Sequence, residues 1–118
     1  MVKSDPFTEI DLSRAVKELE LELITGDINK KAEGIYICDL LSNVIASARS
    51  GDIWLTVQAH MNILAVADLT DVAAVVIVED NEPDQATVDK AAEKGITLLK
   101  SSKTAFELGI DLNYFSSH

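Results

Sequence analysis

Three short polar segments of this sequence contain the side chains that could bind or react with a small molecule. The first segment contains His60, the only histidine outside the last residues of the chain. Histidine is the side-chain type that titrates near neutral pH, but a general base also needs an orienting or charged partner. The sequence identifies no such partner for His60. Capping a helix or contacting a ligand is therefore a better interpretation of this residue than catalysis.

The second segment, residues 79–84, places four carboxylates within six positions. Hard cations prefer such oxygen-rich surroundings, but acidic side chains in the first turn of a helix also interact favourably with the helix dipole. The spacing differs from that of the twelve-residue calcium-binding loop. We therefore expect neither a bound metal nor a cofactor.

The third segment, residues 100–104, combines two lysines with three hydroxyl side chains just before an expected helix. Cations, hydroxyl groups and the N–H groups of a helix start together favour an anion. An ordinary helix cap flanked by solvated lysines is nevertheless the preferred interpretation of this segment, and an anion site is the alternative. No Lys or Arg lies between Arg49 and Lys90, so a phosphate at the other two segments would need backbone N–H groups or a partner subunit.

Each polar segment follows a predicted β-strand and leads into a predicted helix. Apolar runs predict strands over residues 53–57, 72–78 and 96–99. Helical spacing predicts helices over residues 62–69, over residues 83–94 with Pro83 in the first turn and Gly95 at the end, and from a cap among residues 101–103 to Gly109. The carboxyl ends of parallel strands meet at one edge of a sheet, where ligands usually bind. The predicted ligand site at that edge consists of Thr56, Gln58, His60, Asn62, Glu79, Asp80, Ser101 and Ser102.

The first half of the sequence predicts two more strands and two more helices. The strands cover residues 20–25, ended by Gly26, and residues 34–39. The helices cover residues 10–19, capped by Asp11 or Ser13, and residues 40–48, stopped at residues 50–52. Strands that alternate with helices favour right-handed crossovers and a parallel sheet. The predicted fold is a three-layer α/β/α domain with a mostly parallel, mixed sheet of about five strands, and the two N-terminal strands are added at its edge.

The length and charge of the chain limit its organisation and its partners. The 118 residues suffice for one ordinary core, so we expect a single domain over residues 1–118, with its core at about residues 8–112 and a frayed tail at residues 113–118. The net charge of −10 repels polyanions, which argues against nucleic acid and anionic membranes as partners.

The motifs that the sequence lacks favour binding over catalysis. The phosphate-binding loop, the dinucleotide fingerprint, the HExxH zinc motif and the GxSxG nucleophile motif are all missing. Cys38 is the only cysteine, which excludes an internal disulfide, and its apolar surroundings in sequence favour a neutral, buried thiol. The sequence also contains no secretory signal pattern and no apolar run of about 20 residues, so we expect a cytoplasmic protein.

Six segments of the sequence share a dispersed pattern, namely residues 38–42 (CDLLS), 51–57 (GDIWLTV), 74–78 (AVVIV), 82–84 (EPD), 91–96 (AAEKGI) and 104–107 (TAFE). This pattern resembles the DRTGG domain family, and the resemblance covers about residues 8–112. Two segments depart from the family pattern. Many members have Gly-Asp-Arg where this chain has Gln58-Ala59-His60, and Thr-Gly-Gly where it has Glu79-Asp80-Asn81.

The resemblance implies a three-layer α/β domain similar to the N-terminal domain of HPr kinase/phosphorylase, without catalytic residues of its own. Domains of this family are accessory modules that often self-associate. We accordingly expect a non-catalytic regulatory domain that forms a homodimer and binds a small effector, such as an adenine nucleotide, at the carboxyl edge of its sheet. One alternative is a protein-interaction adaptor in a redox or iron-hydrogenase regulatory system, whose acidic surface steers a basic partner. Another is a small hydrolase or transferase that uses His60 with Asp80 or Glu79.

Overall fold

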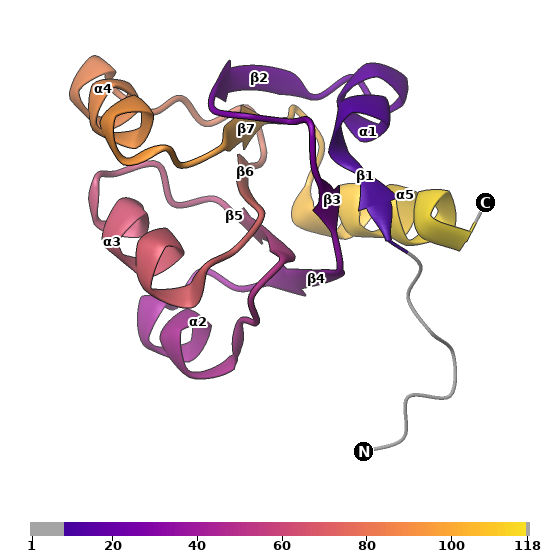
Figure 1. The fold of residues 1–118 in the computed structure, drawn as a ribbon, viewed down its shortest axis with the longest axis horizontal. Helices are drawn as coiled ribbons and strands as arrows, with labels where there is room; N and C mark the ends of the chain where they lie inside the picture. The colour runs from indigo at the N-terminus through magenta and orange to yellow at the C-terminus, as the bar shows by residue number, and fades with distance from the viewer. Residues whose placement is uncertain (1–8, 118) are drawn as a thin grey trace.

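The computed structural model describes residues 9–117, so residues 1–8 of the expected domain and His118 of the expected tail lie outside the described residues. Five strands form the central sheet (Figure 1). The strands are β2 (Glu22–Thr25), β4 (Gly34–Ile37), β5 (Asp52–Thr56), β6 (Ala74–Ile77) and β7 (Leu98–Lys100).

The strand order in this sheet is β2-β7-β6-β5-β4. Strands β4, β5, β6 and β7 are parallel to one another, and β2 is antiparallel to β7. The predicted mostly parallel, mixed sheet is therefore confirmed. The two N-terminal strands do lie at the edges, but at opposite edges, and β4 is one of the parallel strands.

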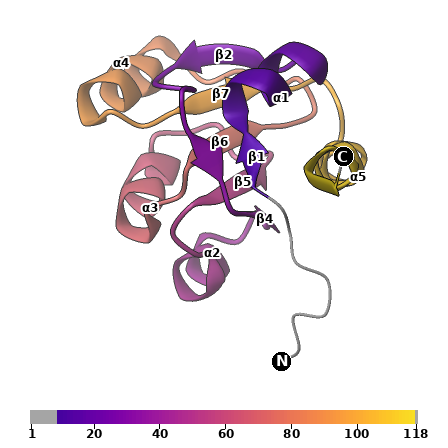
Figure 2. The same cartoon turned by 45° about the vertical axis from the view of Figure 1, so that its right-hand side comes forward.

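Helices cover both faces of the sheet, as Figure 2 shows from a second direction. Strands β4, β5, β6 and β7 lie side by side in the sheet in the order in which they follow along the chain. Right-handed crossovers therefore place all of their connecting helices on one face of the sheet. These are α2 (Leu41–Ser47), α3 (Asn62–Thr70) and α4 (Gln85–Lys94). The other face is covered by α1 (Leu12–Glu18), α5 (Ala105–Ser117) and an antiparallel ribbon of β1 (Ile10–Asp11) with β3 (Lys31–Ala32).

The alternation of side chains along the central strands divides the core into two clusters. Trp54 and Val75 pack with residues of α2, α3 and α4. Ile53, Leu55 and Val76 point the other way and pack with residues of α1 and α5. All four residues of β6 are buried, as expected for an apolar run covered on both faces.

The start of the described chain differs from the prediction. Residues 10 and 11 form β1 instead of the first turn of a helix, and α1 begins at Leu12. The cap is Asp11, whose Oδ1 accepts hydrogen bonds from the backbone N–H groups of Ser13 (3.1 Å) and Arg14 (3.4 Å). A strand of two residues has no detectable periodicity, so the sequence could not reveal the β1–β3 ribbon.

The start of α4 and the end of α2 differ by a few residues from the prediction. Pro83 precedes the cap of α4, and Asp84 is the cap, accepting a hydrogen bond from the backbone N–H of Thr87 at 2.8 Å. Gly95 ends α4 in the left-handed conformation as predicted. Helix α2 ends at Ser47, before the stop expected at residues 50–52.

Helix α5 does not end at Gly109 but continues to Ser117, so residues 113–117 of the expected frayed tail are helical. Thr104, not residues 101–103, caps this helix. Its Oγ1 accepts a hydrogen bond from the backbone N–H of Glu107 at 3.1 Å, and Glu107 Oε1 accepts one from the backbone N–H of Thr104 at 3.0 Å. This reciprocal arrangement is a capping box.

A candidate ligand site at the carboxyl ends of the strands

Four loops meet at the carboxyl edge of the sheet because four neighbouring strands are parallel. Three of these loops contain the residues predicted from the sequence. The fourth, residues 38–40, follows β4 and was not predicted to contribute. The loops are residues 38–40, 57–61, 78–84 and 101–104, and together they form what we call the carboxyl rim.

Asp39 joins the first two loops. Its Oδ1 accepts hydrogen bonds from Thr56 Oγ1 and from the backbone N–H of Val57, each at 2.9 Å. Gln58 Nε2 donates to the backbone carbonyl of Asp39 at 3.0 Å. Thr56 is fully buried, so this contact satisfies a hydroxyl that has no access to water. Two of the predicted ligand-binding residues, Thr56 and Gln58, therefore hold the loops together.

The loop after β6 is a tight turn bound to the loop after β7. Glu79 and Asp80 both have left-handed backbones, with φ of 60° and 59°. Their backbone N–H groups donate to the carbonyls of Lys103 (2.8 Å) and Ser101 (2.9 Å), respectively. The buried Ser101 also accepts a hydrogen bond on Oγ from the backbone N–H of Lys103 at 3.1 Å. Both loops are thus fixed by backbone contacts rather than by a ligand.

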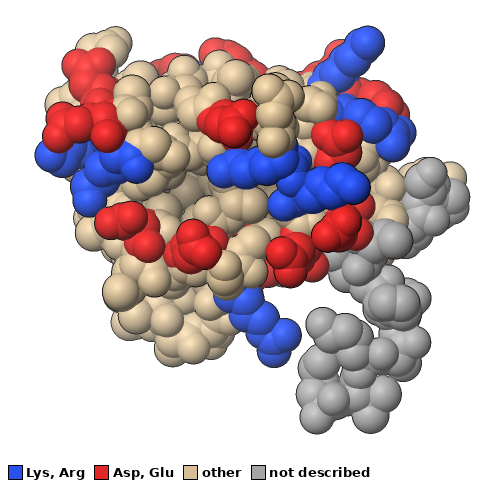
Figure 3. All heavy atoms as spheres, in the orientation of Figure 1, with Lys and Arg blue, Asp and Glu red and all other residues tan. Residues whose placement is uncertain are grey.

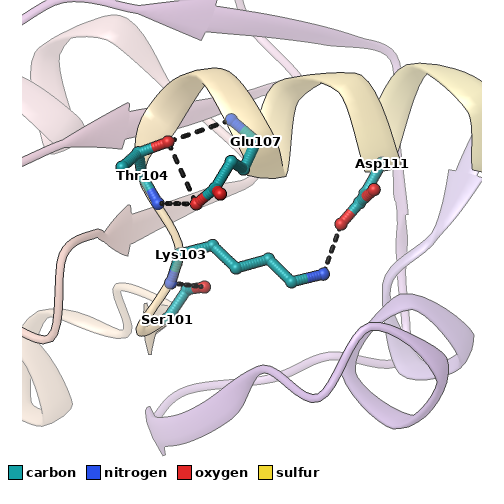
Figure 4. A network of polar contacts seen from close by, with 5 residues as sticks. All are labelled: Ser101, Lys103, Thr104, Glu107 and Asp111. Carbon is teal, nitrogen blue, oxygen red and sulfur yellow. Dashed lines mark hydrogen bonds and ion pairs between the residues drawn. The ribbon is translucent and has the colours of Figure 1, made fainter.

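Both lysines of the predicted anion site are paired with carboxylates. Lys100, whose side chain is 12% exposed, contacts Glu82 and lies 3.2 Å from Asp80. Hydrogen bonds to Glu82 and then Asp80 raise the pKa of Lys100. Lys103 reaches across to Asp111 of α5 (Figure 4). A phosphate at this edge would have to compete with these acids, so an anion site built on the two lysines is not what the structure favours.

Five predicted site residues remain exposed around the bound loops, namely His60, Asn62, Glu79, Asp80 and Ser102, and Asp80 is paired with Lys100. The nearby hydroxyl of Thr87, and then the hydrogen bond from its backbone N–H, lower the pKa of Asp84, and the charge of His60 adds a smaller effect in the same direction. Over residues 9–117, the structure records no hydrogen bond between the His60 ring and Glu79 or Asp80.

The remaining chemical candidates are placed in ordinary packing. Cys38 is half-buried and its carbonyl accepts a hydrogen bond from Trp54 Nε1 at 2.9 Å. The described residues include no group of three or more His, Cys, Asp and Glu side chains that could hold a metal ion. Their helices also include none with the length and apolarity needed to span a membrane.

The fold and these loops define an α/β domain whose polar segments gather at the carboxyl ends of parallel strands. No protein-family model matches the chain, and no curated protein matches its sequence. Among solved structures, it is similar to the crystal structure of the CBS and DRTGG domains of the regulatory region of Clostridium perfringens pyrophosphatase, complexed with the activator diadenosine tetraphosphate.

The similarity to that regulatory region has a TM-score of 0.71 at 14% sequence identity. It covers 90% of this chain and 46% of the other, so this chain spans less than half the length of its structural relative. At this level of identity the likeness establishes a shared fold. What this chain binds has to be argued from its own residues.

Proposed function

We propose that this chain is a non-catalytic regulatory domain that acts as a homodimer and binds a small ligand, an adenine nucleotide, at the carboxyl edge of its sheet. The observation that carries the proposal is the set of four loops already fixed in two pairs, the first two by Asp39 and the last two by the backbone of Glu79, Asp80, Ser101 and Lys103. A preformed rim binds a ligand without the cost of ordering loops. The regulatory role of the structural relative supports the same class of function.

The exposed side chains at this rim suit the base and ribose of a nucleotide better than its phosphates. Asn62, His60 and Ser102 offer hydrogen-bond donors and acceptors. The acids Asp80 and Glu82 already neutralise Lys100, and Glu79 adds a further negative charge. We therefore expect adenosine and AMP to bind more tightly than ATP in the absence of divalent cations.

Calorimetric titration with adenosine, AMP and ATP tests this proposal. Asn62→Ala removes an exposed amide at the rim, and we expect it to weaken binding about 5- to 10-fold, as the loss of one hydrogen bond does. Asn29→Ala, at an exposed position after β2 on the opposite edge of the sheet, is the matched control and should bind as the wild type does. The absence of heat from all three ligands at millimolar concentration would remove the ligand from the proposal.

A protein-interaction adaptor is the second candidate function. It is favoured by the apolar side chains of Phe106 and Tyr114, which are exposed although they lie on a helix that packs on the core. The net charge of −10 would attract a basic partner. Binding of such a partner would weaken as salt is added, whereas binding of adenosine, which is uncharged, would not.

A further inference from the structure

Helix α5 has a second apolar stripe in addition to the one that packs on the sheet. Leu108 and Leu112 are fully buried. Phe106, Ile110 and Tyr114 recur every four residues on another face of the helix, and their side chains are 74%, 52% and 65% exposed. A helix needs only one apolar stripe to pack on a sheet, so the second stripe requires another explanation.

The second stripe lines one side of an open groove of about 530 Å³. Ile35 and Ile37 of β4 line the other side. Gly109 allows this close approach, because a Cβ atom there would lie 3.0 Å from Ile37 Cδ1. None of the seven residues that line the groove is charged, although the chain carries a net charge of −10.

Strand β4, which lines one side of the groove, is an edge strand of the sheet. β4 ends the strand order and pairs only with β5 among the described strands. Cys38 donates its backbone N–H to Leu55 of β5, and this direction alternates along a strand. The N–H and C=O groups of Ile35 and Ile37 therefore point away from β5, where another strand can pair with them.

We propose that a second copy of this chain occupies the groove and pairs its own β4, antiparallel, with this edge. This inference rests on the proposed homodimer and assigns its interface. A two-fold interface must carry both a protruding group and its receiving hollow on the same patch. Here Phe106 and Tyr114 protrude beside the groove that would receive their counterparts.

Charge and area both favour a copy over a different partner. Copies with a net charge of −10 repel one another least where they meet through an uncharged face. Aromatic side chains offer about 150–250 Å² each, so the exposed parts of Phe106 and Tyr114 supply roughly 200–350 Å² of the about 800 Å² per partner found in stable interfaces. The β4 edge and the remaining lining residues lie directly beside them.

The neighbouring groove between α1 and α5 is a weaker candidate. It shares Ile110 and Tyr114 with the first groove, but it is also lined by Arg14, Glu18 and Asp111. Arg14 stacks on Phe115 at 4.9 Å and pairs with Glu18, so the charged groups of this groove already have partners within the chain.

Sedimentation of the wild type and two variants tests the interface. Phe106→Glu places a charge in the groove, and its position in the first turn of α5 makes a glutamate favourable for the helix itself. Leu69→Glu is the matched control, because Leu69 is 69% exposed on α3 and its substitution gives the same net charge as Phe106→Glu. We expect a wild-type dimer, a dissociation constant at least tenfold higher for Phe106→Glu, and less than a twofold change for Leu69→Glu.

Results that contradict the interface can be distinguished from results that contradict the homodimer. Equal effects of the two variants on a wild-type dimer would overturn this interface but leave the homodimer in place. A wild-type species of 12.8 kDa at all concentrations would remove the homodimer itself, while ligand titrations would still test the carboxyl-edge site.

The rate of amide hydrogen exchange along β4 is an independent test of the same interface. The amides of Ile35 and Ile37 should be protected in the wild-type dimer and exchange at least tenfold faster in Phe106→Glu, while amides of the central strand β6 stay protected in both. Protection of Ile35 and Ile37 in a monomeric sample would mean that another segment of the chain covers the edge, which would overturn the proposal.

Discussion

Asp39 is the single side chain on which the carboxyl rim depends most. Replacing it with Ala removes two hydrogen bonds and leaves the buried Thr56 hydroxyl without its acceptor. We expect Asp39→Ala to lower the free energy of unfolding by about 1–3 kcal/mol, because an unsatisfied buried hydroxyl keeps its desolvation cost. Urea denaturation measures this change.

Two comparisons give this prediction a control. Asp39→Asn keeps one acceptor oxygen and should cost less than Asp39→Ala. Asp68→Ala removes an exposed carboxylate 3.6 Å from Lys94, and we expect it to change stability by less than about 1 kcal/mol. Equal losses for Asp39→Ala and Asp68→Ala would contradict the role assigned to Asp39.

Asp84 makes stability depend on pH at the start of α4. Its pKa lies below the ordinary value of 3.8, because the hydroxyl and backbone N–H of Thr87 favour the ionised carboxylate. A lowered pKa gives a stabilisation that is present above the ordinary value and lost as the pH falls through the folded-state pKa.

Asp84→Asn tests this dependence, because an amide can still cap the helix but does not titrate. We expect the wild type to be the more stable of the two at about pH 6 and the difference in unfolding free energy to shrink towards about pH 2. Denaturation at a series of pH values measures it. A difference that stays constant over this range would show that the charge of Asp84 does not stabilise the cap.

At the scale of the element, the capping box distinguishes the observed start of α5 from the predicted one. Thr104→Ala should lower the free energy of unfolding by about 1 kcal/mol, since it removes the acceptor for the Glu107 N–H. Thr104→Ser should retain most of that stability. Ser102→Ala, at an exposed residue once expected among the caps, should change it little. A larger effect at Ser102 than at Thr104 would reverse the assignment.

Sequence patterns located the main helices and the central strands, because burial on one or both faces leaves a clear periodicity. At Gly109 the prediction was wrong. Glycine is a typical helix end, but the apolar spacing of Phe106, Ile110 and Tyr114 continues through this position, and so does α5. Glycine inside a helix costs only about 1 kcal/mol, and here the packing of Leu108 and Leu112 on the core outweighs that cost. The same spacing, followed to its end, would have revealed the second stripe.

The carboxyl rim was predictable in position but not in its contacts. Parallel strands bring their loops to one edge, and that rule applies equally to Asp39, although the apolar run before it extends the predicted strand to residue 39 and hides the loop. The pairing of Lys103 with Asp111 joins a loop to the second turn of α5, and that of Lys100 with Asp80 joins the end of β7 to the loop after β6. Such tertiary pairs leave no local pattern, so the sequence predicted solvated lysines, with an anion site as the alternative, where the structure has internal ion pairs.

At the scale of the whole molecule, the excess of acidic side chains determines how association responds to salt. On the face shown in Figure 3, lysine and arginine side chains lie beside acidic ones rather than in a separate basic patch. Two copies with a net charge of −10 therefore repel over distances set by screening, about 30 Å at 0.01 M salt and about 8 Å at 0.15 M. Added salt removes this repulsion without weakening an uncharged interface.

We thus expect the homodimer to become at least threefold tighter between about 0.02 M and about 0.5 M salt, measured by sedimentation over a dilution series. Asp89→Lys reduces the net charge at an exposed position of α4, away from the groove, and should tighten the dimer at low salt while leaving it nearly unchanged at high salt. A basic protein partner would show the opposite dependence, because salt screens attraction as well as repulsion. A homodimer that dissociates as salt is added would mean that opposite charges, not the apolar groove, hold the two copies together.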